Sequence, residues 1–262
     1  MLRRGNATSG APIWNSPVVD EKRNLVYFGT GESNSPPAHK NTNAIIGIDL
    51  KTGKEKWSFH ATPKDIFNSG CGLNPRPELL NCVKSPETVY RDVDFGASVV
   101  LGTHADGKQM LYAGQKSGSV WAFEPATGKV IWRTALGTGS ALGGVHWGIA
   151  FDKDTVYAPV STVGVAIPGE WDGDPKIKPG LYALNAKTGK IKWQYNPELN
   201  PGEVAPANGR AARSGAMSGA PIVIDGVVIA ATLDGTVHAV DATTGALLWK
   251  KATATTYTTL NG

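Results

Sequence analysis

The chain has 262 residues, of which 41% are hydrophobic and 18% charged, and its formal net charge is +4. A chain of this length can bury a substantial core, and its scattered Lys and Arg residues argue against a nucleic-acid-binding surface. No apolar stretch approaches the roughly 18 residues that a membrane-spanning helix needs. The 32 glycines and 17 prolines, with few helical patterns, predict many short strands joined by turns.

The predicted elements recur along the chain as four copies of one pattern. Each copy is an alternating strand with an acidic or amide residue at its sixth position, followed by Thr-Gly and then by a tryptophan. Thr-Gly supplies a hairpin turn, because glycine tolerates the positive φ that such turns require. The copies are residues 44–57, 119–132, 180–193 and 236–249, and they end at Trp57, Trp132, Trp193 and Trp249.

Two further strands precede each copy, so each unit is typical of a four-stranded antiparallel meander. Four such units in series predict an all-β fold, a β-propeller with about four blades in this chain. A solenoid or a β-sandwich fits the repeat less well. The predicted blades of this single domain cover residues 10–57, 96–132, 144–193 and 219–249.

Loop lengths differ between the two faces of the predicted propeller. In an antiparallel meander, the first and third turns of each blade emerge on one face, and these turns are short. The second turns and the links between blades emerge on the opposite face, which we expect to be the binding face because long loops on a rigid scaffold commonly carry function. This face receives the insertions at residues 31–43, 58–95, 162–180 and 194–218.

Six polar or aromatic side chains are expected to converge at the mouth of this face. Tryptophan offers a flat stacking surface, glutamate and amide oxygens are hard ligands suited to calcium, and lysine pairs with carboxylate or quinone oxygens. The six residues are Trp14, Glu32, Asn68, Lys116, His146 and Trp147.

Ordinary structural roles for the same residues stay open at this point. Trp14 also fits core packing between blades, Glu32 a solvated loop carboxylate, and Lys116 a turn residue beside Ser-Gly. His146 has no second His or Cys at metal-ligand spacing, which argues against a transition-metal site.

The repeat "DxxTGKxxW" resembles the tryptophan-docking motif of the PQQ-dependent alcohol dehydrogenases, whose superbarrel is an eight-bladed propeller. The stretch "GAPIW…NLVYFGTGE" is similar to a segment of that family, and the similarity implies that Trp14 stacks on the quinone and that Glu32 binds calcium. The segment "QKSGSVWAF" similarly implies that Lys116 contacts the quinone oxygens, and "GGVHWG" places His146 and Trp147 near the cofactor. The segments "NSGC" and "DVDFGAS" most resemble the poly(vinyl alcohol) dehydrogenase branch.

The chain departs from the family at the catalytic base. The family's "TPxDxWD" reads "TPKDIFN" here, so Asn68 stands at the position of the basic aspartate. An amide has no proton affinity near neutral pH to act as a base. Asp65, the nearest carboxylate, is therefore a candidate substitute for the base, while Asn68 stays a candidate for the catalytic position and for a metal ligand. Half of the eight blades are not represented, which predicts that the chain is part of a longer protein.

Cysteine usage agrees with an oxidising compartment. Cys71 and Cys82 lie in the longest insertion, where a disulfide would close the loop, and two buried free thiols are the alternative. The first residues lack the apolar middle of a signal peptide, so a periplasmic or secreted protein would carry its leader outside this sequence.

The resemblance implies oxidation of an alcohol, such as poly(vinyl alcohol) or another secondary alcohol, with PQQ and calcium as cofactors. Cytochrome c is the expected electron acceptor, and the sequence itself contains no "CxxCH" haem motif. The alternative is a non-catalytic propeller that binds proteins through its long-loop face, as the outer-membrane assembly lipoprotein with similar repeats does.

Overall fold

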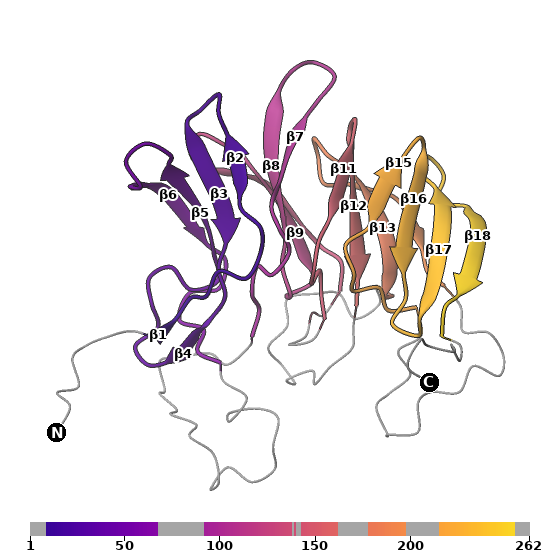
Figure 1. Ribbon diagram of the computed structural model, residues 1–262, viewed down its shortest axis with the longest axis horizontal. Coiled ribbons are helices and arrows are strands. Elements are labelled where there is room, and N and C mark those ends of the chain that lie inside the picture. Colours follow the sequence, from indigo (N-terminus) through magenta and orange to yellow (C-terminus); the bar gives the residue numbers. More distant parts are fainter. Residues whose placement is uncertain are drawn as a thin grey trace, which may run out of the picture.

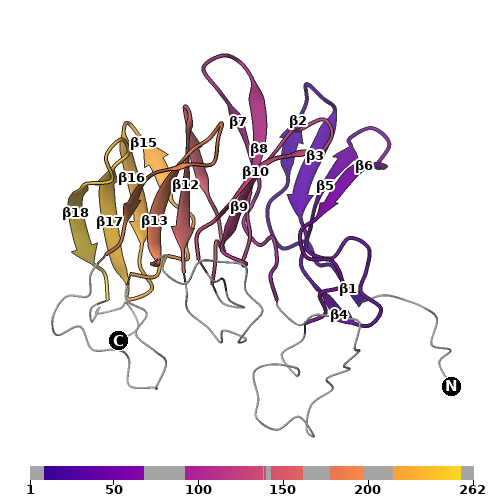
Figure 2. The ribbon, with the colours of Figure 1, turned by 180° about the vertical axis from the view of Figure 1, so that it is seen from behind.

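The computed structural model describes residues 9–67, 92–137, 139, 143–161, 178–197 and 215–254. These residues form strands and turns, and none of them belongs to a helix that is long and apolar enough to cross a membrane. Four antiparallel sheets of four strands stand side by side in chain order, as Figures 1 and 2 show from opposite sides. The prediction of an all-β propeller built from four-stranded blades is confirmed.

Each blade takes its four strands in chain order, from the first to the outermost. Blade 1 contains β2 (Val18–Asp20), β3 (Leu25–Gly29), β5 (Ala44–Asp49) and β6 (Glu55–His60). Blade 2 contains β7 (Val100–Thr103), β8 (Gln109–Gly114), β9 (Ser119–Phe123) and β10 (Val130–Ala135). Blade 3 contains β11 (Ala150–Asp152), β12 (Thr155–Val160), β13 (Gly180–Asn185) and β14 (Ile191–Tyr195). Blade 4 contains β15 (Ile222–Ile224), β16 (Val227–Ala231), β17 (Thr236–Asp241) and β18 (Leu247–Ala252).

One small sheet lies outside the blades. It pairs β1 (Ser9–Gly10) with β4 (Ser33–Ser35), and both figures place it at the lower end of blade 1. The backbone N–H of Ala11 donates to the carbonyl of Glu32, and the N–H of Gly31 donates to the carbonyl of Pro12. These bonds hold the segment before β2 against the segment after β3.

A row of four paired residues crosses each blade and ends on its repeat tryptophan. Paired residues of an antiparallel sheet lie on one face, and in blades 1 to 3 this face packs against the next blade. The third member of the row is glycine or alanine, and a Cβ at Gly47 would lie 2.7 Å from the Trp57 indole. The rows are Val18–Tyr27–Gly47–Trp57, Val100–Tyr112–Ala122–Trp132, Ala150–Tyr157–Ala183–Trp193 and Ile222–Ile229–Ala239–Trp249.

Each tryptophan of blades 1 to 3 lies on the Thr-Gly turn of the following blade. A Cβ at the receiving glycine would lie 2.3 Å from the Trp57 ring at Gly128, 2.7 Å from the Trp132 ring at Gly189 and 2.6 Å from the Trp193 ring at Gly245. The indole Nε1 also donates to a carbonyl of the same turn, at Pro125 (3.0 Å), Ala186 (2.9 Å) and Ala242 (3.1 Å) respectively. Glycine is required at these positions for two reasons: the backbone has a positive φ, and the indole lies where a Cβ would be.

The core lies between the blades rather than inside one sheet. Hydrophobic clusters fill the seams between blades 1 and 2, 2 and 3, and 3 and 4. The Tyr112 hydroxyl crosses one seam to the Ala186 carbonyl (3.2 Å), and the Tyr157 hydroxyl crosses the next to the Ala242 carbonyl (3.2 Å). Because apolar burial and hydrogen bonding both cross the seams, neighbouring blades are fixed relative to one another.

We expect Trp132→Ala to lower the free energy of unfolding by about 3–5 kcal/mol, because the change removes a buried indole and its hydrogen bond to the Ala186 carbonyl. The measurement is a urea unfolding curve. Ile131→Ala changes the preceding, 40% exposed residue and is expected to cost under about 0.5 kcal/mol. Equal losses in the two variants would contradict the docking role of Trp132.

Candidate functional site

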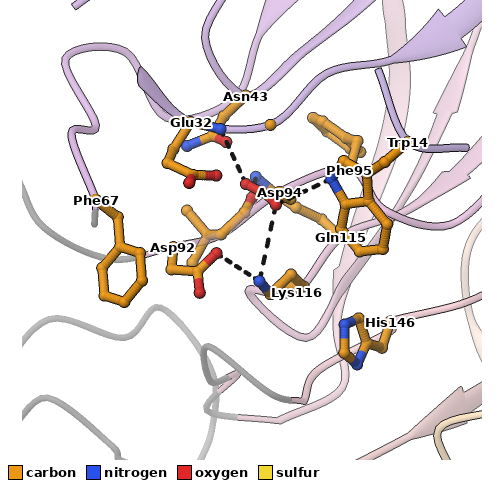
Figure 3. Close-up of polar contacts among 12 residues, drawn as sticks. Trp14, Glu32, Asn43, Phe67, Asp92, Asp94, Phe95, Gln115, Lys116 and His146 are labelled. Atoms are coloured by element: carbon orange, nitrogen blue, oxygen red, sulfur yellow. Dashed lines mark hydrogen bonds and ion pairs between the residues drawn. The ribbon is translucent and has the colours of Figure 1, made fainter. Parts of the chain in front are cut away.

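The candidate site lies at the rim of the seam between blades 1 and 2 where β3 ends and β7 begins, and Figure 3 shows its side chains. Trp14 lies ahead of β2 and Glu32 follows β3, so both leave blade 1 at the same end. Asp92 and Asp94 precede β7, and Lys116 lies in the β8–β9 turn, so these residues leave blade 2 at the corresponding end. Antiparallel strand order therefore gathers side chains that are distant in sequence.

Asp94 connects the two blades at this rim. Its Oδ2 accepts a hydrogen bond from Nε1 of Trp14 at 3.1 Å, and its Oδ1 accepts one from the backbone N–H of Glu32 at 3.0 Å. Its Oδ2 also lies 3.8 Å from Nζ of Lys116, and its backbone carbonyl accepts the Lys116 N–H at 2.9 Å. The carboxylate of Asp94 thus fixes three of the predicted site residues.

Asn15 reinforces the same seam beside Trp14. Its Nδ2 donates to the carbonyls of Gly29 (3.0 Å) and Phe95 (2.6 Å), one from each blade. The Trp14 ring lies against Gly96, where an added Cβ would be 2.1 Å from the indole. The ring position is therefore set by the backbone of blade 2.

Three carboxylates form a compact cluster here. Oxygen atoms of Glu32, Asp92 and Asp94 lie within 4.8 Å of one another, and all three residues are buried. Burial, a hydrogen bond with Asp94 and the charges of both aspartates raise the pKa of Glu32 to about 9. Burial also raises the pKa of Asp92 to about 6, although the Lys116 charge acts in the opposite direction. The raised pKa values indicate that the positive charge near the cluster does not balance the three carboxylates.

Lys116 is the cation that the described residues place inside this cluster. It is buried, and its Nζ donates to Oδ1 of Asp92 at 2.5 Å. The same Nζ lies 5.8 Å from the centroid of the Trp14 ring. One lysine faces three carboxylates, so the site favours a further cation or proton.

The oxygen donors fit a hard divalent cation such as calcium. Asn43 is fully buried and its Oδ1 has no hydrogen-bond partner among the described residues, while its Nδ2 donates to Oδ2 of Asp65 at 2.6 Å. Figure 3 shows Asn43 beside Glu32 and above Asp94. A buried acceptor without a partner is costly unless a ligand satisfies it, and carboxylate and amide oxygens are the ligands that calcium prefers.

An aromatic group lies next to the carboxylates. The rings of His146 and Trp147 stack on each other with centroids 4.7 Å apart, and both are nearly perpendicular to the Trp14 ring, with centroids 5.8 and 5.1 Å from it. Burial and the nearby Lys116 charge lower the pKa of His146 to about 4, so its imidazole is neutral near pH 7. Trp147 is 53% exposed. The group offers flat, uncharged surfaces suited to a planar ligand.

Asp65 occupies a supporting position. It has no exposed surface, and its Oδ2 accepts from Nδ2 of Asn43 and from the N–H of Val93 (3.4 Å). It thereby holds the segment between the two site aspartates. Asn68, Cys71 and Cys82 lie outside the described residues.

Asp92 and Asp94 have no predicted role from the sequence. Their signal was the segment "DVDFGAS", which places two carboxylates directly before the first strand of a blade. First strands begin at the face that carries the long loops, and this placement alone marks the pair as site candidates. The structure brings them together with Trp14, Glu32 and Lys116.

Comparison with known proteins adds family evidence to this geometry. A family model described as "Outer membrane protein assembly factor BamB" matches residues 116–262. Polyvinylalcohol dehydrogenase of Sphingopyxis sp. (strain 113P3) is 36% identical over 97% of this chain and 37% of that protein. A second polyvinylalcohol dehydrogenase, from a Pseudomonas species, is 35% identical over 94% of the chain and 36% of its own length. The chain thus spans a little over a third of these relatives.

A solved structure shows the same fold. The quinohemoprotein alcohol dehydrogenase from Comamonas testosteroni superposes with a TM-score of 0.60 at 19% identity, over 94% of this chain and 42% of that one. The chain therefore belongs to the propeller family that the matching model describes and that includes the PQQ-dependent alcohol dehydrogenases.

Proposed function

We propose that the chain forms the PQQ- and calcium-binding part of a dehydrogenase that oxidises alcohols, poly(vinyl alcohol) or another secondary alcohol being the substrate class. The observation that carries the proposal is the buried cluster of Glu32, Asp92 and Asp94, tied by a hydrogen bond to the Trp14 indole. A propeller that served only as a scaffold has no need of three buried carboxylates facing one lysine. The relatives named as polyvinylalcohol dehydrogenases support the substrate class.

In this proposal, Glu32 and Asp94 supply carboxylate oxygens to calcium. The Oδ1 of Asn43, which has no hydrogen-bond partner among the described residues, is the proposed neutral ligand. Asn68 remains a proposed ligand from the sequence. PQQ, when bound, supplies the two-electron acceptor for the hydride of the alcohol carbon. Trp14 provides the stacking surface, and its ring is held by contacts with His146, Trp147 and Gly96.

Asp92 is the proposed general base. Its pKa of about 6 suits removal of a hydroxyl proton near neutral pH, and Lys116 holds its Oδ1 in place. Both oxygens of Asp94 already accept hydrogen bonds from Trp14 and Glu32, so Asp94 is better suited to positioning and metal binding. We assign Asp65 to support, because its carboxylate is fully buried.

Electron transfer to a cytochrome c in the periplasm completes the proposal. A relative that is 25% identical over 92% of the chain is named lupanine 17-hydroxylase [cytochrome c]. Cys71 and Cys82, which lie outside the described residues, suit an oxidising compartment by their sequence context.

A protein-binding scaffold is the second candidate function. It is favoured by the family model, whose description names an outer membrane assembly factor. However, the model matches residues 116–262, and the three clustered carboxylates lie before that range. The match therefore describes the repeated blades, while the three carboxylates and Trp14 belong to the part before it.

Calcium affinity is expected to rise with pH. Glu32 keeps its proton up to about pH 9 in the metal-free protein. Calcium binds the carboxylate form and therefore displaces this proton, so the apparent calcium affinity should rise about tenfold per pH unit below pH 9. The metal-free protein should also lose stability as pH rises from 4.5 to about 9, because only the unfolded state releases the proton in this range.

Isothermal titration calorimetry and thermal unfolding across this pH range measure both effects. Glu32→Gln should weaken calcium binding and remove the loss of stability. Asp106→Asn changes an exposed carboxylate and should leave both unchanged. Calcium affinity that does not vary with pH in the unaltered protein would count against Glu32 as a ligand.

Trp14→Ala should weaken PQQ binding about tenfold, since an offset aromatic stack contributes about 0.5–1.5 kcal/mol beyond its buried area. Calorimetric titration with PQQ in excess calcium gives the affinity. Ile13→Ala is the matched control, because Ile13 is the adjacent and 56% exposed residue. Unaltered PQQ affinity in Trp14→Ala would remove the stacking role.

Asp92→Asn should lower kcat about 10²- to 10⁴-fold in the PQQ- and calcium-loaded enzyme, because the variant cannot accept the hydroxyl proton. Dye-linked oxidation of a secondary alcohol reports the rate. Calcium affinity should also change, because Asp92 is buried within 4.8 Å of Glu32 and Asp94, so kcat is compared at saturating calcium and PQQ. A variant that retains full kcat would show that another group is the base.

A further inference from the structure

A basic hollow lies on the short-turn face of the propeller, at the opposite end of the seam from the carboxylate cluster. Three turns meet there, the β2–β3 turn of blade 1 and the β7–β8 and β9–β10 turns of blade 2. The first two of these turns stand at the upper end of the blades in Figure 1. The hollow has a volume of about 510 Å³, and its charged lining residues are Lys22, Arg23, Lys108, Lys129 and Glu124.

The walls of the hollow are held across the seam by direct bonds. Nη1 of Arg23 donates to Oδ2 of the buried Asp20 at 2.7 Å and to Oε1 of Gln109, in blade 2, at 2.8 Å. The indole of Trp57 lies on the β9–β10 turn and donates to the Pro125 carbonyl at 3.0 Å. The guanidinium and the turns are therefore in place before a ligand arrives, which lowers the entropic cost of binding.

Positive charge exceeds negative charge in this hollow. Asp20 neutralises Arg23, at 2.7 Å, and Glu124 is the one carboxylate among the described lining residues. Three exposed lysines have no ion-pair partner among the residues that the structure describes, namely Lys22, Lys108 and Lys129. A concave surface with an excess of one charge attracts counter-ions.

The next seam shows the same turns with their charges paired. Between blades 2 and 3, Nζ of Lys187 lies 2.9 Å from Oδ2 of Asp106, which joins the β13–β14 turn to the β7–β8 turn. Nδ1 of His104 is hydrogen-bonded to Asp154, which joins the β7–β8 turn to the β11–β12 turn. Carboxylates of this chain therefore neutralise the cations of the second seam, whereas the lysines of the first seam stay available to a ligand.

We propose that the hollow binds a small, multiply charged oxyanion of the pyrophosphate class. Guanidinium and ammonium groups form strong, charge-assisted hydrogen bonds with phosphate oxygens. Two linked phosphate groups reach cations of both blades at once, whereas a singly charged anion does not. The described lining residues include no aromatic side chain on which a base could stack, so recognition is of the phosphate groups. The site shares no residue with the carboxylate cluster and does not depend on the proposed function.

Calorimetric titration of the metal-free chain with sodium pyrophosphate, at about 0.1 M ionic strength, tests the proposal. Saturable binding is expected, and the double variant Lys108→Gln/Lys129→Gln should weaken it about tenfold, because two charged contacts are lost. Lys153→Gln/Lys190→Gln is the matched control. It removes the same charge from turns of blade 3, and Lys190 follows its Thr-Gly turn as Lys129 does. The control should stay within about twofold, because neither lysine lines the hollow and salt screens more distant charges.

Glu124→Gln should strengthen pyrophosphate binding about two- to fivefold, because it removes the carboxylate that repels the ligand. The amide can still hold the turn. Oδ1 of Asn185, at the equivalent position of blade 3, accepts from the N–H and the hydroxyl of Thr188 at 3.0 and 3.1 Å. A purely structural role of Glu124 does not predict tighter binding. Near-ultraviolet circular dichroism should show native packing in every variant.

Absence of saturable binding at millimolar pyrophosphate in the unaltered chain overturns the proposal. Equal weakening in the two double variants also overturns it, because binding would then follow total charge rather than the hollow. Adenosine diphosphate is the third ligand in the experiment and should bind no more tightly than pyrophosphate, which supports recognition of the phosphate groups. Tighter binding of the nucleotide overturns that assignment.

Discussion

The seating of an indole on the glycine of a neighbouring Thr-Gly turn is the contact on which the structure depends. Trp57, Trp132 and Trp193 each bury their rings against the next blade and donate Nε1 to one of its carbonyls. Burying such a side chain removes about 150–250 Å² from water, which corresponds to about 4–6 kcal/mol before the entropic cost of ordering it. The contact fixes both the spacing and the direction of successive blades.

The packing of blade 1 against blade 2 determines the geometry of the candidate site. Trp14 and Glu32 belong to blade 1, Asp94 and Lys116 belong to blade 2, and the bonds of Asp94 join them. None of these side chains lies in the middle of a strand, so the sheets position the site without contributing to its chemistry. This separation of scaffold and chemistry allows related propellers to carry different functions.

The electrostatics of the site differ from those of the scaffold. Elsewhere, buried polar groups such as Tyr112 and Trp132 are paired across the seams. At the rim, burial raises the pKa of Glu32 and of Asp92 because three carboxylates share one lysine. Burying like charges together costs stability that the seams must offset, and such local conflict is typical of a site that binds a cation.

The sequence by itself determined the blades, because Thr-Gly and tryptophan at fixed spacing leave one way to bury each indole. It also placed Trp14, Glu32, Lys116 and His146 on one face, since strand direction alternates regularly in a meander. Only the tertiary structure decided which carboxylates meet them. No repeat pattern predicts where Asp92 and Asp94 lie, and their place at the rim depends on bonds such as that from the Val93 N–H to Asp65. The burial and the pKa of each carboxyl group likewise depend on neighbours distant in sequence. For this reason the pairing of Asp92 with Lys116, and the bonds by which Asp94 joins the two blades, are visible only in the packed structure.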